Sequence, residues 1–368
     1  MSSDLLKHIG RNIIFQESHM ISFATFMENC LYHHEWGYYR KRLDKVGKNG
    51  DFFTSSHVHQ IFGEVLADSF LLSFTEIASK KPVLLELGGG TGRLMQQVLT
   101  RIRECEPSIY QNLEVIMVEI SPFHIECQKE SLESFDIPIR WYSSVQEAAL
   151  QEEFEGIIFS NEYFDAFPVH LLEKQAAKWH EIGVTCLEEN DEPVFQEKTM
   201  PVSLITNQLN DRLPTHLPDG MRIEWQDGIE EVIEALGTML KRGRIITIDY
   251  GDEEGELYHE SRKNGTLVCY YQHQMNEEPF MRVGEQDITA HVNFTRIREW
   301  GEKIGLHTVE YQRQDQFLIQ NGILEKAQAH QDRDPFTSKA MKQNRAISQL
   351  LLPGGLGGLF RVLIQEKK

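Results

Sequence analysis

The sequence has no apolar run of about 18 or more residues, the length that a membrane-spanning helix needs. Its first residues include Asp4 and Glu17, and they lack the apolar core and the small-residue cleavage site of a secretory signal. These two absences predict that the protein is not inserted in a membrane and that it is cytoplasmic.

Cysteine is also sparse, and no two cysteines form a C-x-x-C pair. The five cysteines lie far apart along the chain: Cys30, Cys105, Cys127, Cys186 and Cys269. An odd, scattered set argues against a disulfide framework and against a zinc site. The histidines at His33-His34 and His57-x-His59 have no second cluster with metal-ligand spacing, so we expect no metal.

Positive charge is scarce relative to negative charge. The chain has 37 Lys and Arg against 56 Asp and Glu, a formal net charge of -19. Binding to nucleic acid needs clustered Lys and Arg that contact phosphates, so this balance disfavours a nucleic-acid partner. A basic protein or peptide partner is favoured instead, and a homodimer is left open.

The composition is otherwise that of a protein with a sizeable core. The content of hydrophobic residues is 40% and that of charged residues is 25%, both ordinary for a globular chain. A length of 368 residues exceeds the usual size of one domain. The chain is therefore expected to form one large domain with an insertion, or two domains.

The segment Pro82 to Leu94, PVLLELGGGTGRL, has the pattern of a strand, a glycine turn and the start of a helix. Glycines allow positive φ and let a ligand approach without a Cβ in the way. The dinucleotide fingerprint fails, because its sixth position falls on Arg93 or Met95 rather than on Gly or Ala. No G-x-x-x-x-G-K sequence occurs either, which excludes that phosphate-binding loop. The pattern that remains is E-x-G-x-G-x-G, formed by Glu86, Gly88, Gly90 and Gly92.

This pattern resembles the first motif of class I S-adenosylmethionine-dependent methyltransferases. The resemblance implies that Gly88, Gly90 and Gly92 cradle the amino-acid end of S-adenosyl-L-methionine. It also implies that Glu86 is the acidic residue that closes the strand before the turn. The cofactor expected from the sequence is therefore S-adenosyl-L-methionine.

A second acidic residue, Glu119, ends the apolar run that begins at Leu113. An acidic residue at the end of the second core strand is placed to accept hydrogen bonds from the two ribose hydroxyls of a nucleoside. A surface glutamate after a strand is the alternative, but the spacing after a matching glycine turn favours the cofactor role. A third strand at 139–143 would bring Ser143 or Ser144 near an adenine ring.

Strands and helices alternate through most of the chain. Apolar strands at 113–119, 139–143, 156–159 and 244–250 are separated by segments of helical spacing. This alternation predicts an α/β fold with a doubly wound, Rossmann-like sheet and a ligand at the carboxyl ends of the strands. The resemblance to class I methyltransferases implies seven strands.

Three regions are predicted. Residues 1–78 form a helical N-terminal extension or lid, 79–170 with 241–368 form the core that binds S-adenosyl-L-methionine, and 171–240 form an inserted α+β region for the substrate. Apolar spacing predicts a helix at 17–35. The segment 50–74 either covers the cofactor pocket or only caps the sheet edge, and Thr54 within it is predicted to contact the cofactor.

Four stretches together resemble the MidA family. They are GDFFTSSHVHQIFGE at 50–64, VLLELGGGTGRLM at 83–95, SNEYFDAFPVH at 160–170 and GEQDITAHVNF at 284–294. The resemblance covers nearly the whole chain. It implies protein arginine methyltransferase activity, because eukaryotic members of that family are mitochondrial complex I assembly factors with this activity. The chain departs from the family pattern at Ser56-His57, where Pro-Glu is usual, and at Gln97, where an acidic residue is common.

The candidate catalytic residues follow the fourth strand. A guanidinium group is cationic at neutral pH and binds best to planar carboxylates. We therefore predict that Glu162 is the main guanidinium anchor and that Asp165 is a second carboxylate or a turn cap. Asn161 is predicted to hydrogen-bond the cofactor. Transfer of a methyl group requires in-line alignment rather than a metal or a covalent enzyme intermediate.

Three hypotheses of function follow from the sequence. The first is a methyltransferase that uses S-adenosyl-L-methionine and acts on arginine in a protein or peptide. The second is a methyltransferase on the same core that acts on another residue or on a small molecule. The third is an assembly factor that binds the cofactor without catalysis.

Overall fold

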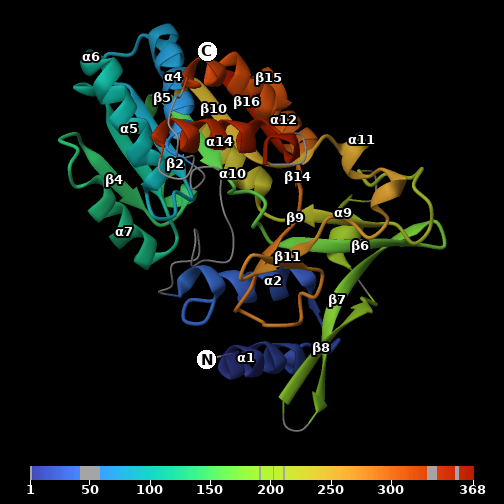
Figure 1. Cartoon of the computed structure of the whole chain (residues 1–368). Coiled ribbons are helices and arrows are strands. Elements are labelled where there is room, and N and C mark those ends of the chain that lie inside the picture. The colour runs from blue at the N-terminus through green and yellow to red at the C-terminus, as the bar shows by residue number, and fades with distance from the viewer. Residues whose placement is uncertain are drawn as a thin grey trace.

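The computed structural model describes residues 2–41, 59–189, 192–201, 203–209, 212–329, 338–352 and 356–368. Figure 1 shows a large α/β core and a smaller part that contains the N-terminal helices and a long hairpin. Thr54 and the pair Ser56-His57 lie outside the described residues. The cofactor contact of Thr54 and the lid role of its segment therefore stay predictions.

An eight-stranded sheet forms the centre of the core. Seven strands follow the order β15-β16-β10-β5-β2-β3-β4, and β14 pairs with the end of β10. Neighbouring strands from β10 to β4 run parallel, whereas β16 is antiparallel to both β10 and β15. The bounds are β2 (Val83–Leu87), β3 (Glu114–Val118), β4 (Ile139–Tyr142), β5 (Phe154–Asn161), β10 (Leu240–Asp252), β14 (Val292–Asn293), β15 (His307–Arg313) and β16 (Phe360–Lys367).

The predicted mixed α/β fold with a mainly parallel central sheet is confirmed. The sheet has eight strands instead of seven because β10 is long. Its pairing with β5 ends at Ile248, and Gly251 and Asp252 beyond that point pair with β14. The short β14 was not recognisable in the sequence because two residues carry no periodic pattern.

Helices cover both faces of the central sheet, which explains why its strands are apolar on both sides. On one face, Leu84 belongs to a buried cluster with residues of α4, α5, α13 and α14. On the other face, Leu85 belongs to a cluster with residues of α8, α10 and α12. These helices are α4 (Ile61–Ile77), α5 (Arg93–Cys105), α8 (Val145–Ala149), α10 (Ile229–Met239), α12 (Phe294–Lys303), α13 (Gln314–Gln320) and α14 (Lys339–Leu351).

Four further helices of the core and its connections are short or peripheral. They are α6 (Pro107–Tyr110), α7 (Pro122–Leu132), α11 (Glu254–Leu257) and α15 (Leu356–Leu359). The start of α7 is capped, because the Ser121 side chain accepts a hydrogen bond from the His124 N–H and Pro122 occupies the first turn.

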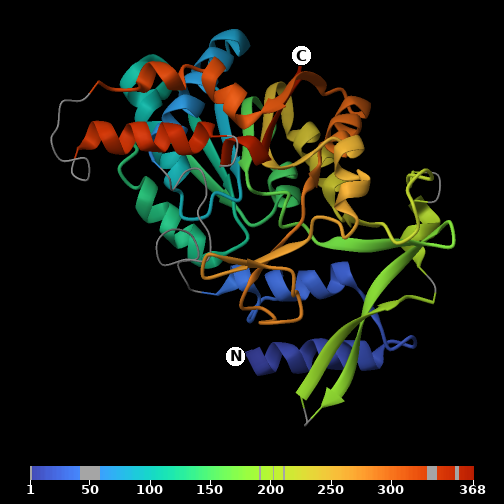
Figure 2. The same cartoon turned by 45° about the vertical axis from the view of Figure 1, so that its right-hand side comes forward.

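A second sheet lies beside the core and has the order β1-β7-β6-β9, with β8 paired to β7. The hairpin of β7 and β8 extends away from the core in both Figure 1 and Figure 2. The bounds are β1 (Ile21–Ser22), β6 (Val169–Gln175), β7 (Lys178–Glu189), β8 (Glu192–Thr199) and β9 (Arg222–Gln226), with α9 (Leu204–Leu209) between β8 and β9. Most of the predicted insertion 171–240 lies here, whereas α10 packs against the central sheet.

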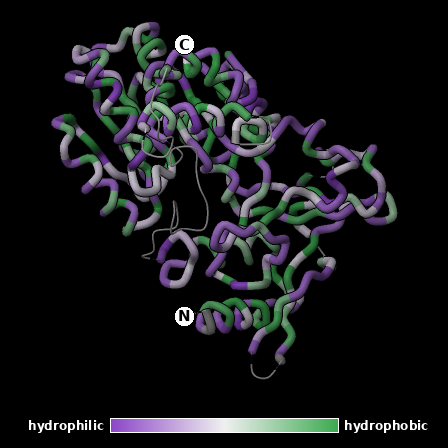
Figure 3. Tube along the Cα trace, viewed as in Figure 1, coloured by the Kyte–Doolittle hydropathy of each residue, from purple (hydrophilic) through white to green (hydrophobic). Residues whose placement is uncertain are grey.

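The N-terminal helices pack against this second sheet. The helices α1 (Ser2–Phe15) and α2 (Phe23–Tyr32) share a buried cluster with β6, β7 and a small third sheet. The third sheet has the order β12-β11-β13, with β11 (Val268–Tyr271), β12 (Gln274–Asn276) and β13 (Asp287–Thr289). Figure 3 shows hydrophobic residues alternating with hydrophilic ones along α1, as expected of a helix with one buried face.

Candidate functional site

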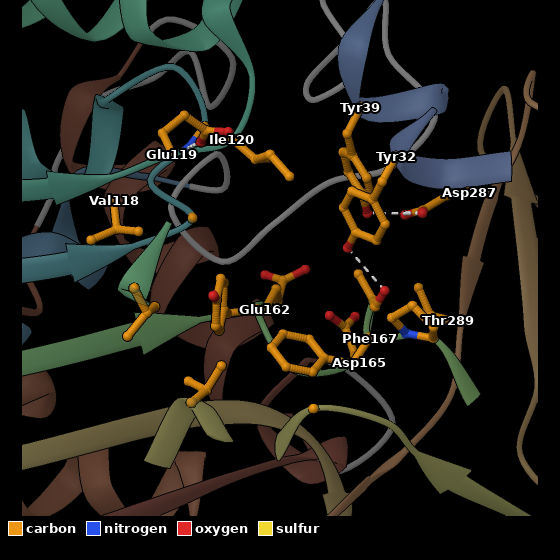
Figure 4. A pocket seen from close by; sticks show the side chains of 18 of the residues that line it. Tyr32, Tyr39, Val118, Glu119, Ile120, Glu162, Asp165, Phe167, Asp287 and Thr289 are labelled. Carbon is orange, nitrogen blue, oxygen red and sulfur yellow. Dashed lines mark hydrogen bonds between the residues drawn. The ribbon is translucent and has the colours of Figure 1, made fainter. Parts of the chain in front are cut away.

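A cavity of about 890 Å³ lies at the carboxyl ends of the central strands, where the core meets the N-terminal helices. It brings together most of the residues that the sequence singled out. Those that line it are Glu86, Gly88, Gly90, Glu119, Ser144, Asn161, Glu162 and Asp165. Gly92 does not line the cavity but precedes α5 as its N-cap. Figure 4 shows Glu119 on one side, Tyr32, Tyr39 and Asp287 on the other, and Glu162 between them.

The glycine turn after β2 leaves bare backbone beside the cavity. Gly88 and Gly90 have φ of +63° and +52°, the left-handed region that glycine tolerates. A Cβ added at Gly88 would meet Tyr163 Cδ2 at 2.8 Å. A Cβ added at Gly90 would meet no protein atom within 4 Å and would project into open space. The turn therefore offers room in which a ligand can contact the backbone closely.

Glu119 ties this turn to the end of β3. Its side chain is 6% exposed, and its two carboxylate oxygens accept hydrogen bonds from the Gly90 N–H at 3.1 Å and the Ser121 N–H at 2.9 Å. Gln128 of α7 donates from Nε2 to the Gly90 carbonyl at 2.9 Å and so supports the same turn. The sequence indicated Glu119 but not Gln128, which reaches the turn from the buried face of α7.

Glu86 is a buried carboxylate whose Oε2 has no hydrogen-bond partner among the described residues. Burial, together with the smaller effect of the neighbouring charge on Glu119, raises its pKa to about 8. Asn161, which also lines the cavity, has an unpartnered buried Oδ1. Two unpartnered acceptor oxygens beside a glycine turn suit a ligand with N–H donors, such as the ammonium group of an amino acid.

The buried Glu86 makes the stability of the ligand-free protein depend on pH. In the folded protein its pKa is raised from 4.5 to about 8, so the folded state holds a proton that the unfolded state releases. The stability that this proton contributes is fully present below pH 4.5 and is lost as the pH rises through about 8. The wild type loses about 1.4 kcal/mol of stability for each unit of pKa shift. We expect Glu86→Gln not to show this loss, because its side chain stays neutral at every pH.

Urea unfolding of the wild type and of Glu86→Gln at about pH 5 and about pH 9 measures this effect. The free energy of unfolding of the variant, relative to the wild type, is expected to rise with pH. Glu104→Gln, at an exposed position of α5, is the matched control and should follow the wild type. If the difference in the free energy of unfolding between Glu86→Gln and the wild type is the same at both pH values, the buried, protonated state of Glu86 is contradicted.

The loop after β5 carries the predicted catalytic residues. Glu162 has a φ of +55°, which is strained for a residue with a side chain, and its N–H donates to the Ile248 carbonyl at 3.0 Å. Asn161 donates from Nδ2 to Glu162 Oε1 at 3.0 Å. Strained backbone of this kind persists where the surrounding structure holds it, and it concentrates at functional sites.

Asp249, at the carboxyl end of β10, holds this loop in place. Its side chain is fully buried, and Oδ2 accepts hydrogen bonds from the N–H groups of Tyr163 at 3.1 Å and Phe164 at 2.8 Å. Burial raises the pKa of Asp249 to about 7. Asp249 was not predicted from the sequence, although its place near the carboxyl end of a core strand is the same signal that indicated Glu119.

The far end of the cavity combines carboxylates with tyrosine rings. Burial raises the pKa of Asp165, and the nearby charges of Asp249, Glu162 and Asp287 raise this pKa further. The Tyr39 hydroxyl donates to Asp287 Oδ1 at 2.8 Å, as Figure 4 shows. The ring of Tyr39 stacks on that of Tyr32 with 5.5 Å between centroids.

Tyr32 fixes the predicted catalytic loop from the N-terminal side. Its hydroxyl donates to the Ala166 carbonyl at 2.9 Å, across 134 positions of sequence. The sequence analysis did not identify Tyr32, Tyr39 or Asp287 as site residues. Asp287 lies within the stretch 284–294 that it singled out, but nothing in a single sequence shows which residue of that stretch faces a cavity.

The lining of the cavity is strongly acidic. Among its described residues Arg93 is the one Lys or Arg, and the side chain of Arg93 is exposed. The acidic residues that line it are Glu28, Glu86, Glu119, Glu162, Asp165, Asp227, Glu231 and Asp287. A cavity with this balance attracts cations and disfavours phosphate groups.

Ser144 has a structural partner in addition to its place at the cavity. It is the N-cap of α8, and its hydroxyl oxygen accepts a hydrogen bond from the Glu147 N–H at 3.1 Å.

Within the described ranges, no group of three or more His, Cys, Asp or Glu side chains has the arrangement of a metal site. No helix in the described part of the chain has the length and apolar character needed to cross a membrane.

Comparison with known proteins gives three kinds of match. The model of a family described as "Putative S-adenosyl-L-methionine-dependent methyltransferase" matches residues 65–312. A Drosophila melanogaster protein, "Protein arginine methyltransferase NDUFAF7 homolog, mitochondrial", is 28% identical over 77% of this chain and 67% of its own length. The Homo sapiens protein "Protein arginine methyltransferase NDUFAF7, mitochondrial" is 25% identical over 81% of this chain and 69% of its own length.

A solved structure is similar over the whole chain. It is a candidate methyl transferase from Burkholderia thailandensis bound to S-adenosyl-homocysteine, and it is 29% identical with a TM-score of 0.86. The match covers 100% of this chain and 92% of that one. The fold that surrounds the cavity is thus shared with a protein that holds the demethylated form of the expected cofactor.

The predicted cytoplasmic location is wrong. The absence of a secretory signal predicted a cytoplasmic protein, but the curated relatives from fly, zebrafish and human are all named as mitochondrial. The prediction rested on the absence of a secretory signal, which carries no information about the other compartments of a cell.

Proposed function

The chain belongs to the family of S-adenosyl-L-methionine-dependent methyltransferases, and from this premise we propose that it methylates the guanidinium group of arginine in a protein or peptide. The observation that carries the proposal is the acidic end of the cavity, where Glu162, Asp165 and Asp287 lie beside two tyrosine rings. Carboxylates and aromatic faces are the groups that bind a planar cation best.

The cofactor of the protein is S-adenosyl-L-methionine, which supplies a methyl group on a positively charged sulfur. The described residues fit it. We propose that Gly88, Gly90 and the unpartnered oxygens of Glu86 and Asn161 bind its amino-acid end. Glu119 would accept hydrogen bonds from the ribose hydroxyls, because each oxygen of a carboxylate has a second lone pair available.

The two carboxylates after β5 are proposed to orient the acceptor. Glu162 would hold the guanidinium through charge-assisted hydrogen bonds and direct one nitrogen toward the methyl group. Asp165 is a second acceptor whose raised pKa would fall once a cation binds beside it. The strained backbone at Glu162 is fixed by Asp249 and Ile248, so its carboxylate is held before the substrate arrives.

A protein or peptide substrate is proposed because two relatives are named as protein arginine methyltransferases and because the chain is acidic. The net charge of -19 favours the approach of a basic segment. We further propose that, of the predicted region 1–78, α2 and the residues up to 41 close the acceptor end of the cavity, whereas α4 belongs to the core, and that the second sheet contributes to substrate choice. Tyr32 and Tyr39, which line the cavity, support the first of these roles.

We also propose that the seven strands in the order β15-β16-β10-β5-β2-β3-β4 correspond to the seven-stranded sheet of class I methyltransferases.

Calorimetric titration with S-adenosyl-L-methionine, followed by a radiolabelled methyl assay on lysate protein, tests the proposed function. We expect binding with one site per chain and label that acid hydrolysis releases as methylarginine. Label on another residue or on a small molecule would contradict the arginine assignment. Binding without transfer to any acceptor would contradict catalysis and favour an assembly factor that only binds the cofactor.

A further inference from the structure

We propose that His170 is the catalytic proton acceptor of the methyl-transfer reaction and that Glu181 and Ser203 position it. The inference rests on the proposed function, because a proton must leave the acceptor nitrogen when that nitrogen is methylated. His170 is the second residue of β6, and it lines the same cavity as Glu162 and Asp165.

The histidine is held by a buried carboxylate on the neighbouring strand. His170 Nδ1 lies 2.7 Å from Glu181 Oε1, and the two side chains are 15% and 4% exposed. The second oxygen of Glu181, Oε2, accepts a hydrogen bond from the Ser203 hydroxyl at 2.6 Å. Ser203 is itself fixed, because its oxygen accepts from the Thr206 N–H at 3.1 Å. Each member of this chain of contacts therefore has a defined partner.

This arrangement fixes which ring nitrogen can take a proton. The Ser203 hydroxyl donates to Glu181, so Glu181 acts as an acceptor on that side, and its other oxygen is free to accept from His170. Nδ1 of His170 then carries the hydrogen, and Nε2 keeps its lone pair. Within the described part of the chain, Nε2 has no hydrogen-bond partner. Because Nδ1 is engaged with Glu181, Nε2 is the nitrogen left to meet a ligand in the cavity.

The reaction requires such an acceptor. A bond forms between the acceptor nitrogen and the methyl carbon, and the bond between sulfur and that carbon breaks with its electron pair going to sulfur. The nitrogen that has used its lone pair is strongly acidic, and its proton passes to Nε2 of His170. The imidazolium is stabilised by the Glu181 carboxylate, and the proton is later released to solvent. The balance is one methyl group transferred and one proton set free.

The carboxylates of the cavity are the other candidate proton acceptors, but the proposed function assigns them to binding of the cationic acceptor. Asp165, Asp287 and Glu162 line the cavity and, under the proposed function, balance the charge of the guanidinium. Asp227 lines the same cavity, next to β9, which pairs with β6 at His170. An imidazole oriented by a carboxylate has both an available lone pair on Nε2 and a countercharge for the imidazolium that forms.

Three variants test the role. His170→Gln keeps a side chain that can contact Glu181 but cannot accept a proton, and His170→Ala leaves space for added imidazole. Glu181→Gln retains the size of the carboxylate but loses its charge. The control is His180→Gln, because His180 is the neighbour of Glu181 on β7 but does not line the cavity. The measurements are the affinity for S-adenosyl-L-methionine, kcat with an arginine peptide, and the ¹⁵N shifts of the His170 ring in the ligand-free protein.

We expect His170→Gln and His170→Ala to lower kcat about 100-fold with unchanged cofactor affinity, since general base catalysis typically contributes that much or more. Imidazole should restore part of the activity of His170→Ala but not of His170→Gln. The ring shifts should show hydrogen on Nδ1 in the wild type and a mixture of tautomers in Glu181→Gln. The control should match the wild type in all measurements.

The outcomes separate this inference from the proposed function. If the wild type methylates arginine and His170→Gln retains its kcat, or imidazole does not rescue His170→Ala, the inference is wrong and the proposed function stands. If the wild type methylates another acceptor, the arginine assignment fails, and the same variants decide the role of His170 there. A wild type that binds the cofactor but transfers nothing contradicts both.

Discussion

Glu162→Gln is expected to abolish methyl transfer while the affinity for S-adenosyl-L-methionine stays unchanged. The substitution preserves the size of the side chain and its contact with Asn161, but it removes the negative charge that would balance a guanidinium. Loss of one preorganised charged contact in a closed site lowers kcat by about 10²- to 10³-fold. Steady-state kinetics with an arginine peptide and calorimetric titration with the cofactor measure the two quantities separately.

The matched control for this experiment is Glu104→Gln, an equivalent substitution at an exposed position of α5 away from the cavity. It should behave as the wild type in both measurements. Transfer by Glu162→Gln at the rate of the wild type would show that the anchor of the acceptor lies elsewhere, and Asp165 or Asp287 would be the next residues to test. A fall in cofactor affinity would instead place Glu162 in the cofactor subsite.

Glu119→Ala is expected to weaken binding of S-adenosyl-L-methionine by 10²-fold or more. The carboxylate holds Gly90 and Ser121 through backbone N–H groups, and it is proposed to accept from the two ribose hydroxyls. A hydrogen bond to a charged group contributes about 1.5–3 kcal/mol, and two of them together account for a change of this size. Calorimetric titration measures it, and the arginine peptide is not needed.

Glu130→Ala, on the exposed side of α7, controls for a general effect of lost negative charge. Circular dichroism of Glu119→Ala establishes that the variant is folded, because the same carboxylate also fixes the glycine turn. A Glu119→Ala protein that is folded and binds the cofactor as tightly as the wild type would contradict the assignment of Glu119 to the ribose.

The cofactor side of the cavity was predictable because its signals are local in sequence. The glycine turn needs Gly88 and Gly90 at fixed spacing after a strand, and their positive φ is what that spacing predicts. Glu119 ends an apolar strand, and parallel strands bring their carboxyl ends to one edge of the sheet. The same rule applies to Asp249 near the carboxyl end of β10, so the sequence carries the signal for this residue as well.

The acceptor side was not predictable in the same way, because it is assembled from distant segments. Tyr39 donates to Asp287 across 248 positions of sequence. His170 stands in the stretch 160–170 that the sequence indicated, but its partner Glu181 belongs to a hairpin that the sequence placed in an insertion. Such pairings depend on how two sheets pack, and no periodic pattern within one segment records that packing.

In the N-terminal region, the periodic spacing of apolar residues did not give the correct ends of the helix. Apolar spacing predicted one helix at 17–35, whereas the structure has α2 at Phe23–Tyr32 and a two-residue strand before it. Ser22 caps α2, since its hydroxyl oxygen accepts a hydrogen bond from the Thr25 N–H. The strand β1 forms because Ile21 pairs with Val184 of β7, a partner more than 160 positions away. A tertiary contact thus shortened the helix that local spacing favoured.

The most direct test of the arginine assignment is tandem mass spectrometry of two peptides after incubation with the purified protein and S-adenosyl-L-methionine that carries a deuterated methyl group. The peptides are basic and identical except that one contains arginine and the other lysine at the central position. The predicted result is a deuterated methyl group on the guanidino nitrogen of the arginine peptide, none on the lysine peptide, and none on either peptide with Glu162→Gln. Label on the lysine peptide, or no label on either peptide from a wild type that binds the cofactor, would contradict it.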